Sequence, residues 1–369
     1  MIRKSIKCIC TENPEQWIWT EYMLLQNEET ARRYLIDAYS RRPFNQPDRL
    51  AYRNVPAFTS YINQATSLIK ESQTNHPWVR PILLYYGMMS MLKAWLLTRI
   101  PDYPQNTAVL RHGLSTRKRK RERFRFCEDE IKIQREGLFP LVAEEWNLPP
   151  MTGESYTAKE LFSFIPDLHP TYHRLFQQKS LARVFFTRSG AGLLLHVPEQ
   201  VLDHFHLSAE RLVDKLNQAR HGLFSLSTSR GYDGYLTLHC ACDEEGLSTV
   251  VVDNPLPPHP GFPSLSTTES LCVSFHHPWF YENKKGDLYL WLGNDRPVAP
   301  LPEILVHLML LFSLSMLCRY DPPLWGEIML DNQQAEQIII HELLELVPRK
   351  FAQLMLTAFA EEKLILRAH

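Results

Sequence analysis

The sequence predicts an α+β protein in which N- and C-terminal helices form one bundle and a β-rich unit is inserted between them. Helical periodicity dominates the first 100 residues and returns from Leu301 onwards. Between about residues 181 and 295, alternating and β-branched segments predict strands. The chain has 369 residues, more than a single hydrophobic core usually holds.

We therefore expect three segments along the chain. Residues 1–180 hold the first helices, a basic loop and a short hairpin. Residues 181–298 form the β-rich unit, and residues 299–369 are helices that pack back on the first segment.

Three helices are expected in the first 100 residues. Asn27 can cap a helix that runs to about Tyr39. Apolar residues at helical spacing predict a second helix over about 58–71, and Pro81 suits the first turn of a third. The apolar run 82–97 is shorter than the roughly 20 residues that span a membrane, so it predicts a buried core helix.

The middle of the chain changes pattern twice. Residues 102–123 have no apolar periodicity and predict a long loop. Alternating residues then predict two short strands, one around Phe124 and Phe126 and one around Ile131 and Ile133. Residues Thr157 to Glu160 match a capping box, which predicts a short helix.

The β-rich unit is expected to begin with a hairpin, ARVFFT and GLLLHV, that turns at residues 188–191. Ser208 can cap an amphipathic helix that runs to about Arg220. GYLTLHCAC, STVVVD, LCVSF and DLYLWLG follow as strands. Residues 253–263 contain five prolines and predict a stiff connector.

The last segment predicts one long, mostly buried helix over 301–320, which Pro322 and Pro323 end. Three amphipathic helices are expected after it, near 324–331, 334–346 and 348–361.

The charge distribution is uneven. Seven of the nine residues from Arg117 to Arg125 are basic, although the formal net charge of the chain is only -1. A general nucleic-acid coat would be basic throughout, so this charge predicts one local site for an anion. Burying so many unpaired charges is too costly. The run therefore faces water and nearby acidic residues, an acidic protein surface or a polyanion.

The start of this run combines donor types that phosphate sites use. RHGLSTRK contains an imidazole, a glycine that lets a ligand approach the backbone, two hydroxyls and fixed cations. The candidate phosphate-binding residues are Arg111, His112, Ser115, Thr116, Arg117, Lys118, Arg119 and Lys120. Arg319 either adds to an anion pocket or pairs structurally with Asp321.

No metal, cofactor or catalytic motif is predicted. The seven cysteines are odd in number and irregularly spaced, which favours reduced thiols in a cytosol. Cys8-x-Cys10 and Cys240-x-Cys242 depart from the usual zinc spacing, so core cysteines are expected. The sequence contains no G-x-S-x-G, G-x4-G-K-[ST], H-E-x-x-H or G-x-G-x-x-G. The N-terminus has no long apolar run, so neither a signal peptide nor a membrane partner is expected.

Four segments carry a family resemblance. They are ILLYYGMMSMLKAWLL (82–97), YPQNTAVLRHGLSTRKRK (103–120), ELFSFIPDL (160–168) and LFSLSMLCRYDPPLWGEIM (311–329). With these segments the chain resembles the YaaC-like family of bacterial proteins. Members of that family are encoded beside IMP dehydrogenase, so the resemblance implies a purine-synthesis enzyme as a candidate protein partner.

A second resemblance concerns the helices. The segment LKAWLL, followed by a turn and His112-Gly113, is similar to HEPN domains, which are compact helical bundles. Catalytic HEPN ribonucleases use an Arg-x4-His pair on the RNA backbone. Thr107 stands here where that motif has its arginine, so the resemblance implies a HEPN-like bundle without the nuclease pair.

Three functions agree with these observations. The first is a non-enzymatic cytosolic binding or regulatory protein whose basic loop holds a phosphate-bearing ligand, either a nucleotide or RNA. The second is a protein-interaction module that uses the same loop against an acidic surface and regulates a metabolic enzyme such as IMP dehydrogenase. The third is a HEPN-type ribonuclease with a degenerate site.

Overall fold

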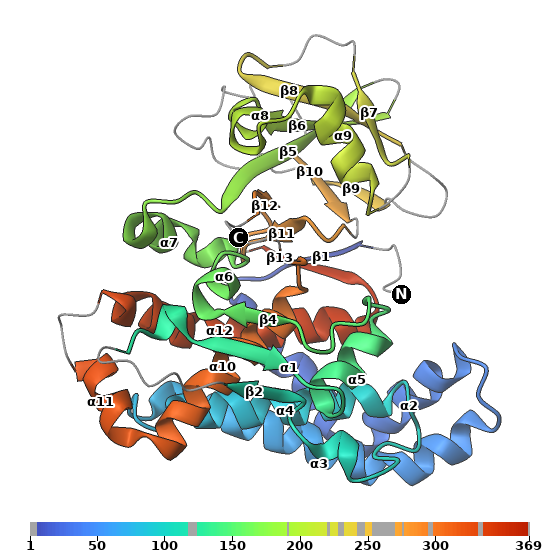
Figure 1. Cartoon of the computed structure of the whole chain (residues 1–369). Helices are drawn as coiled ribbons and strands as arrows, with labels where there is room; N and C mark the ends of the chain where they lie inside the picture. The colour runs from blue at the N-terminus through green and yellow to red at the C-terminus, as the bar shows by residue number, and fades with distance from the viewer. Residues whose placement is uncertain are drawn as a thin grey trace. The chain divides into compact units, whose positions relative to one another are not determined.

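The computed structural model (Figure 1) describes residues 6–116, 124–189, 192–219, 222–227, 232–241, 248–252, 270–274, 277–293, 298–330 and 335–367. Helices and sheets are both present, which confirms the α+β class. The chain divides into two compact units. The helical unit contains Thr11–Phe162 and Pro302–Ala360, and the sheet unit contains Ile2–Cys10, Ser163–Leu301 and Glu361–His369.

The helical unit is built around two helices that are apolar on nearly every side, α4 and α10. Its helices from the first part of the chain are α1 (Pro14–Gln26), α2 (Glu28–Ser40), α3 (Pro47–Thr74) and α4 (Arg80–Leu97). Those from the last part are α10 (Glu303–Tyr320), α11 (Pro322–Leu330) and α12 (Glu336–Ala360). Both α10 and α12 pack against α4, because a helix without a polar face must be covered on all sides.

Two predictions about the first helices have different outcomes. The Asn27 side chain accepts hydrogen bonds from the N–H groups of Glu29 and Thr30 at 3.1 and 3.2 Å, which confirms the predicted cap. The apolar stripe over about 58–71 lies within α3, as predicted, but the helix is longer than the stripe and begins at Pro47. Proline is compatible with a first turn, and the helix continues through Pro56 while its apolar face stays buried.

A small antiparallel sheet lies in the helical unit, with strand order β2-β3-β4. Its strands are β2 (Leu114–Thr116), β3 (Glu130–Ile133) and β4 (Ser155–Thr157). The strand at Ile131 and Ile133 is confirmed. The loop predicted over 102–123 is wrong at β2, and Phe126 lies in the 3-10 turn η2 (Phe126–Glu128) instead of a strand. The alternation of apolar and charged residues predicted β3. It did not predict β2 and β4, which lie before and after β3 in the chain and pair with it.

Short helices complete this part of the unit: η1 (Ala108–Leu110), α5 (Leu138–Glu145) and α6 (Ala158–Phe162). The predicted capping box is confirmed at α6. The N–H of Thr157 donates to Glu160 Oε2 at 2.7 Å, and the N–H of Glu160 donates to Thr157 Oγ1 at 3.2 Å.

The C-terminal helices differ from the prediction in number. Three helices were expected after α10, whereas the described residues there form two, α11 and α12, because α12 continues through Pro348. A proline inside a helix costs about 3 kcal/mol. Leu344 before it and Phe351 after it are both buried, and their burial offsets that cost. Pro322 and Pro323 lie at the start of α11, where a missing N–H costs little.

The sheet unit contains a six-stranded antiparallel sheet with strand order β11-β12-β5-β6-β8-β7. The strands are β5 (Leu181–Ser189), β6 (Gly192–Pro198), β7 (Phe224–Leu226), β8 (Tyr235–Cys240), β11 (Phe280–Glu282) and β12 (Leu288–Trp291). The predicted β5–β6 hairpin is confirmed. Of the four residues predicted to form its turn, Arg188 and Ser189 belong to β5 and pair with β6, and 190 and 191 lie outside the described residues.

Two further strand pairs belong to the sheet unit. The antiparallel pair is β9 (Ser248–Val252) with β10 (Ser270–Ser274), both expected from the sequence. The parallel pair is β1 (Ile6–Cys10) with β13 (Lys363–Arg367), near the two ends of the chain (Figure 1). The proline-rich connector 253–263 lies outside the described residues.

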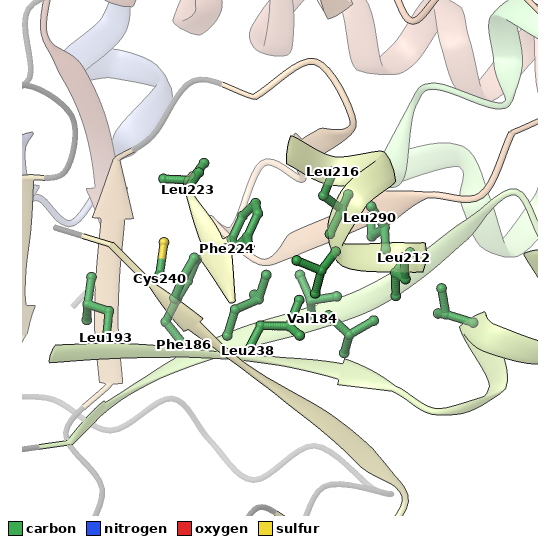
Figure 2. Packing of buried hydrophobic residues seen from close by; sticks show 14 of the residues in the cluster. Val184, Phe186, Leu193, Leu212, Leu216, Leu223, Phe224, Leu238, Cys240 and Leu290 are labelled. Atoms are coloured by element: carbon green, nitrogen blue, oxygen red, sulfur yellow. The ribbon is translucent and has the colours of Figure 1, made fainter. Parts of the chain in front are cut away.

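Helices α8 (Gln200–Phe205) and α9 (Ala209–Asn217) supply side chains to the core of the sheet unit. Figure 2 shows Leu212 and Leu216 of α9 packed with Val184 and Leu238 of the sheet. Ser208 Oγ accepts from the N–H of Arg211 at 3.4 Å, which confirms the predicted cap. Residues of one parity on each strand share a face, so this face of the sheet is apolar.

The remaining helices of the sheet unit are η3 (Pro166–Leu168) and α7 (His169–Phe176). Residues 163–180 were expected in the first segment, but they lie in this unit.

One helix among the described residues, α10, is long and apolar enough to cross a membrane by length and composition alone. Within the structure 78% of that span is buried. The core helix of a soluble protein meets the same criterion, so α10 is only weak evidence for a membrane span.

Candidate anion-binding site

The backbone around His112 is held against the start of α5. The carbonyl of His112 accepts a hydrogen bond of 3.2 Å from the N–H of Phe139. Gly113 has a φ of 75°, and a Cβ placed on it would lie 2.4 Å from Pro140 Cδ. Only glycine allows this approach, so the position of His112 is set by its own backbone and not by its side chain alone.

The imidazole of His112 packs between residues of α4 and α10. Its Nδ1 lies 2.8 Å from Tyr85 Oη. The ring centroids of Tyr85 and Phe312 lie 5.4 and 5.5 Å from that of His112. The ring is only partly buried, so it is oriented by the core while still reaching solvent.

The surroundings of His112 favour its neutral form. Burial lowers its pKa, and the positive charges of Arg319 and Lys93 lower that pKa further. Burial raises the pKa of Tyr85, whose phenol stays protonated. A phenol is the better donor and a neutral imidazole nitrogen the better acceptor, so Tyr85 donates to Nδ1. The imidazole proton is then on Nε2, for which no hydrogen-bond partner is found among the described residues.

Arg319 lies in the last turn of α10 and is surrounded by phenols. Its Nη1 donates to Tyr86 Oη at 2.7 Å, and its Nη2 donates to Tyr320 Oη. Its Cζ lies 5.7 Å from the ring centroid of Tyr86 and 4.7 Å from that of Tyr320. Within the described ranges no carboxylate lies at ion-pair distance from it, and a phenol does not neutralise a guanidinium.

The pair of Arg319 with Asp321 that the sequence suggested is therefore absent among the described side chains. Asp321 Oδ1 instead accepts a hydrogen bond of 3.3 Å from the N–H of Leu324, in the first turn of α11. The Asp321 carboxylate thus stabilises the start of α11, and the guanidinium of Arg319 stays available to bind an anion.

We call the group of side chains around His112 the His112 cluster. It consists of Tyr85, Tyr86, Lys93, His112, Phe312 and Arg319. Lys93 has its Nζ 5.8 Å from the ring centroid of Tyr61, and burial lowers its pKa. The cluster combines two cations with an imidazole N–H donor. Such a set suits an anion with several oxygens.

The residues predicted from the sequence are placed as follows. Arg111 is exposed, and its Nη1 lies 3.8 Å from Glu136 Oε2. Ser115 Oγ accepts from Gln134 Nε2 at 2.6 Å. Thr116 is the last residue of β2 and is partly buried. Arg117, Lys118, Arg119 and Lys120 lie outside the described residues. Of the eight, the structure brings His112 into the cluster.

Sequence reasoning missed Tyr85, Tyr86 and Lys93, which it treated as parts of a core helix. A signal existed. Tyr86 and Lys93 are seven residues apart on α4, so they lie on the same face of the helix. Lys93 is also the one charged side chain in the run 82–97.

The zinc hypothesis gains no support from the described residues. Among them no group of three or more His, Cys, Asp or Glu side chains is placed to hold a metal ion. The Cys240 side chain is 2% exposed and lies in the core of the sheet unit. The side chains of Cys8, Cys10, Cys242 and Cys272 lie outside the described part of the chain.

The comparisons with known proteins give one match. The family model described as YaaC-like protein matches residues 23–359. No curated protein matches the chain, and no solved structure matches it. The matched range includes most of the helical unit and most of the sheet unit. The two units therefore occur together in one family.

Proposed function

We propose that this chain, which belongs to the YaaC-like protein family, binds a phosphate-bearing ligand at the His112 cluster. The observation that carries the proposal is the environment of Arg319. Its hydrogen-bond partners among the described residues are the phenols of Tyr86 and Tyr320, and its charge acts on His112.

The electrostatics of the cluster support an anion as the ligand. Arg319 and Lys93 both lower the pKa of His112, which means that the imidazole lies in a positive field. A phosphate oxygen beside these groups would accept from the guanidinium and from His112 Nε2. Hydrogen bonds to charged groups contribute about 1.5–3 kcal/mol each.

The chain order adds a second source of cations. The basic run from Arg117 begins directly after Thr116, the last residue of β2. In the proposal, Arg117, Lys118, Arg119 and Lys120 supply further phosphate contacts for a ligand larger than a single phosphate. A regulatory role in the cytosol, with a nucleotide or RNA as the ligand, is part of this proposal.

The HEPN-like architecture of the helical unit also belongs to the proposal. It is supported by the packing of α10 and α12 on α4 and by the position of His112 after the LKAWLL helix. Thr107 occupies the place of the arginine in the Arg-x4-His pair. We therefore favour binding over RNA hydrolysis.

The test is a binding titration at several salt concentrations. Labelled single-stranded RNA and a nucleoside triphosphate are titrated against purified wild-type protein, Arg319→Ala and His112→Ala. For RNA, we expect the logarithm of the affinity to fall linearly with the logarithm of salt, by about 0.7 per phosphate contact. Arg319→Ala should weaken binding at least about tenfold, because a charged hydrogen-bond donor is lost.

The matched control is Arg33→Ala. Arg33 is an exposed arginine of α2 whose guanidinium is already paired with Glu29, so its loss should leave affinity unchanged. Affinity that does not respond to salt, or that responds equally to both arginine variants, would contradict the proposal.

The same protein distinguishes the other two functions. A protein partner with an acidic surface, such as a purine-synthesis enzyme, would stay bound after nuclease treatment and nucleotide removal. Its binding would be lost when Arg117, Lys118, Arg119 and Lys120 are changed to alanine. A ribonuclease would hydrolyse the RNA, and His112→Ala would abolish that hydrolysis.

A further inference from the structure

Tyr320 is an exposed aromatic side chain next to the proposed anion site. It is the last residue of α10, and 67% of its surface is exposed. A ring of this size contributes most to stability when it is buried. Burial in the core of the helical unit therefore does not explain a tyrosine at this position.

The ring of Tyr320 is held beside the guanidinium of Arg319. The Tyr320 hydroxyl accepts a hydrogen bond from Arg319 Nη2, and Arg319 Cζ lies 4.7 Å from the Tyr320 ring centroid. Arg319 is itself held by Tyr86 at 2.7 Å. The Tyr86 ring lies 5.7 Å from that of Tyr85, whose hydroxyl contacts His112. An exposed ring is thus kept next to a cation that is connected to His112 through two tyrosines.

We propose that Tyr320 stacks on a nucleobase while Arg319 and His112 hold the attached phosphate. This inference rests on the proposed function and narrows its ligand to the nucleotide class, either a mononucleotide or single-stranded RNA. Aromatic rings stack on every base because each base has a π face. Inorganic phosphate has no aromatic ring that could stack on Tyr320.

The experiment compares ligands with and without a base. Adenosine triphosphate and tripolyphosphate present similar phosphate chains, and only the first carries a nucleoside. A short labelled single-stranded RNA forms the third arm. The variants are Tyr320→Ala, which removes the ring, and Tyr320→Phe, which keeps the ring and removes the hydroxyl that holds Arg319.

We expect Tyr320→Ala to weaken binding of base-bearing ligands about tenfold, within the range for one stacked base. Tripolyphosphate affinity should change by less than about twofold, and Tyr320→Phe should bind base-bearing ligands nearly as well as wild type. A loss in the RNA arm alone assigns single-stranded RNA. A loss that includes adenosine triphosphate assigns the mononucleotide as well.

The control variant is Tyr52→Ala. Tyr52 lies on α3, is 75% exposed, and takes part in none of the ring contacts or hydrogen bonds of the His112 cluster. Its replacement should change no affinity.

Two results would overturn the inference while leaving the proposed function intact. In the first, Tyr320→Ala binds all three ligands as wild type does, while Arg319→Ala binds none of them well. In the second, Tyr320→Phe loses as much affinity as Tyr320→Ala, so that the hydroxyl matters and the ring does not. If wild type binds none of the three ligands, the proposed function and the inference both fail.

Discussion

His112 in the helical unit and His196 in the sheet unit are both histidines whose pKa is lowered by burial, but their contacts differ. His196 lies on β6 and is 2% exposed. Its Nε2 lies 2.7 Å from Thr187 Oγ1, and its Nδ1 lies 3.2 Å from Thr237 Oγ1. Both ring nitrogens are therefore satisfied within the sheet unit, and the ring also stacks on Phe185 with centroids 4.7 Å apart.

His112 has its Nδ1 engaged by Tyr85, and its Nε2 has no hydrogen-bond partner among the described residues. Positive charges contribute to its lowered pKa, whereas the cause at His196 is burial. A lowered histidine pKa does not by itself distinguish a structural residue from a binding residue. The distinction lies in an unengaged nitrogen and in the charges around it.

The largest expected difference between the two histidines is in stability. His196→Ala leaves the hydroxyls of Thr187 and Thr237 without their buried partner and opens a cavity, so the free energy of unfolding should fall by about 3 kcal/mol. His112→Ala, at a partly exposed site, should lower it by about 1 kcal/mol. Urea denaturation of both variants measures the difference. Equal losses of unfolding free energy in the two variants would contradict the structural role of His196.

The second prediction concerns stability at low pH. The pKa of His196 is about 4 in the folded protein, against about 6.5 in an unfolded chain. Between these values the unfolded state binds more protons, so its contribution to stability is complete above about pH 6.5 and is lost as pH falls toward about 4. The loss is at most about 1.4 kcal/mol per pH unit for this group. His169, whose folded pKa is also about 4, adds a loss of the same sign.

The measurement is the free energy of unfolding of wild type and His196→Gln at several pH values and constant salt. The variant should show a shallower pH dependence, because its side chain does not titrate. Parallel curves would show that His196 is not the group responsible.

The third prediction concerns ligand affinity and applies to His112 alone. A bound phosphate favours the imidazolium, so binding raises a pKa that Arg319 and Lys93 lower in the free protein. Affinity for RNA should therefore increase as the pH is lowered and His112 takes up a proton, by at most about tenfold per pH unit. Titrations of wild type and His112→Gln test this, since the variant should lose the increase. An increase that persists in the variant would assign it to another group.

The smallest expected effect is at Ser115. Its hydroxyl already accepts a hydrogen bond from Gln134, so Ser115→Ala should lower the free energy of unfolding by about 0.5 kcal/mol. RNA affinity should stay within about twofold of wild type. A tenfold loss of RNA affinity would instead indicate that the Ser115 hydroxyl contacts the ligand.

Local signals in the sequence predicted some residues of the candidate site and not others. His112 was identified because the donor types of a phosphate site follow one another in RHGLSTRK. For Arg319 the sequence offers two interpretations, and the ion pair with Asp321, two positions further on, does not form among the described side chains. The apolar run 82–97 predicts a core helix that includes Tyr86, whereas the Tyr86 hydroxyl accepts a hydrogen bond from Arg319, 233 positions away in the chain.

The sequence by itself determined the elements that depend on near neighbours. The cap at Asn27, the capping box at Thr157 and Glu160, and the β5–β6 hairpin each join residues that are close in the chain, so composition and spacing identify them. Only the tertiary structure decided which strands pair with β3, that α12 continues through Pro348, and that Arg319 and Lys93 act on His112. These outcomes depend on packing between distant segments, and a local pattern carries no information about which distant segment will cover it.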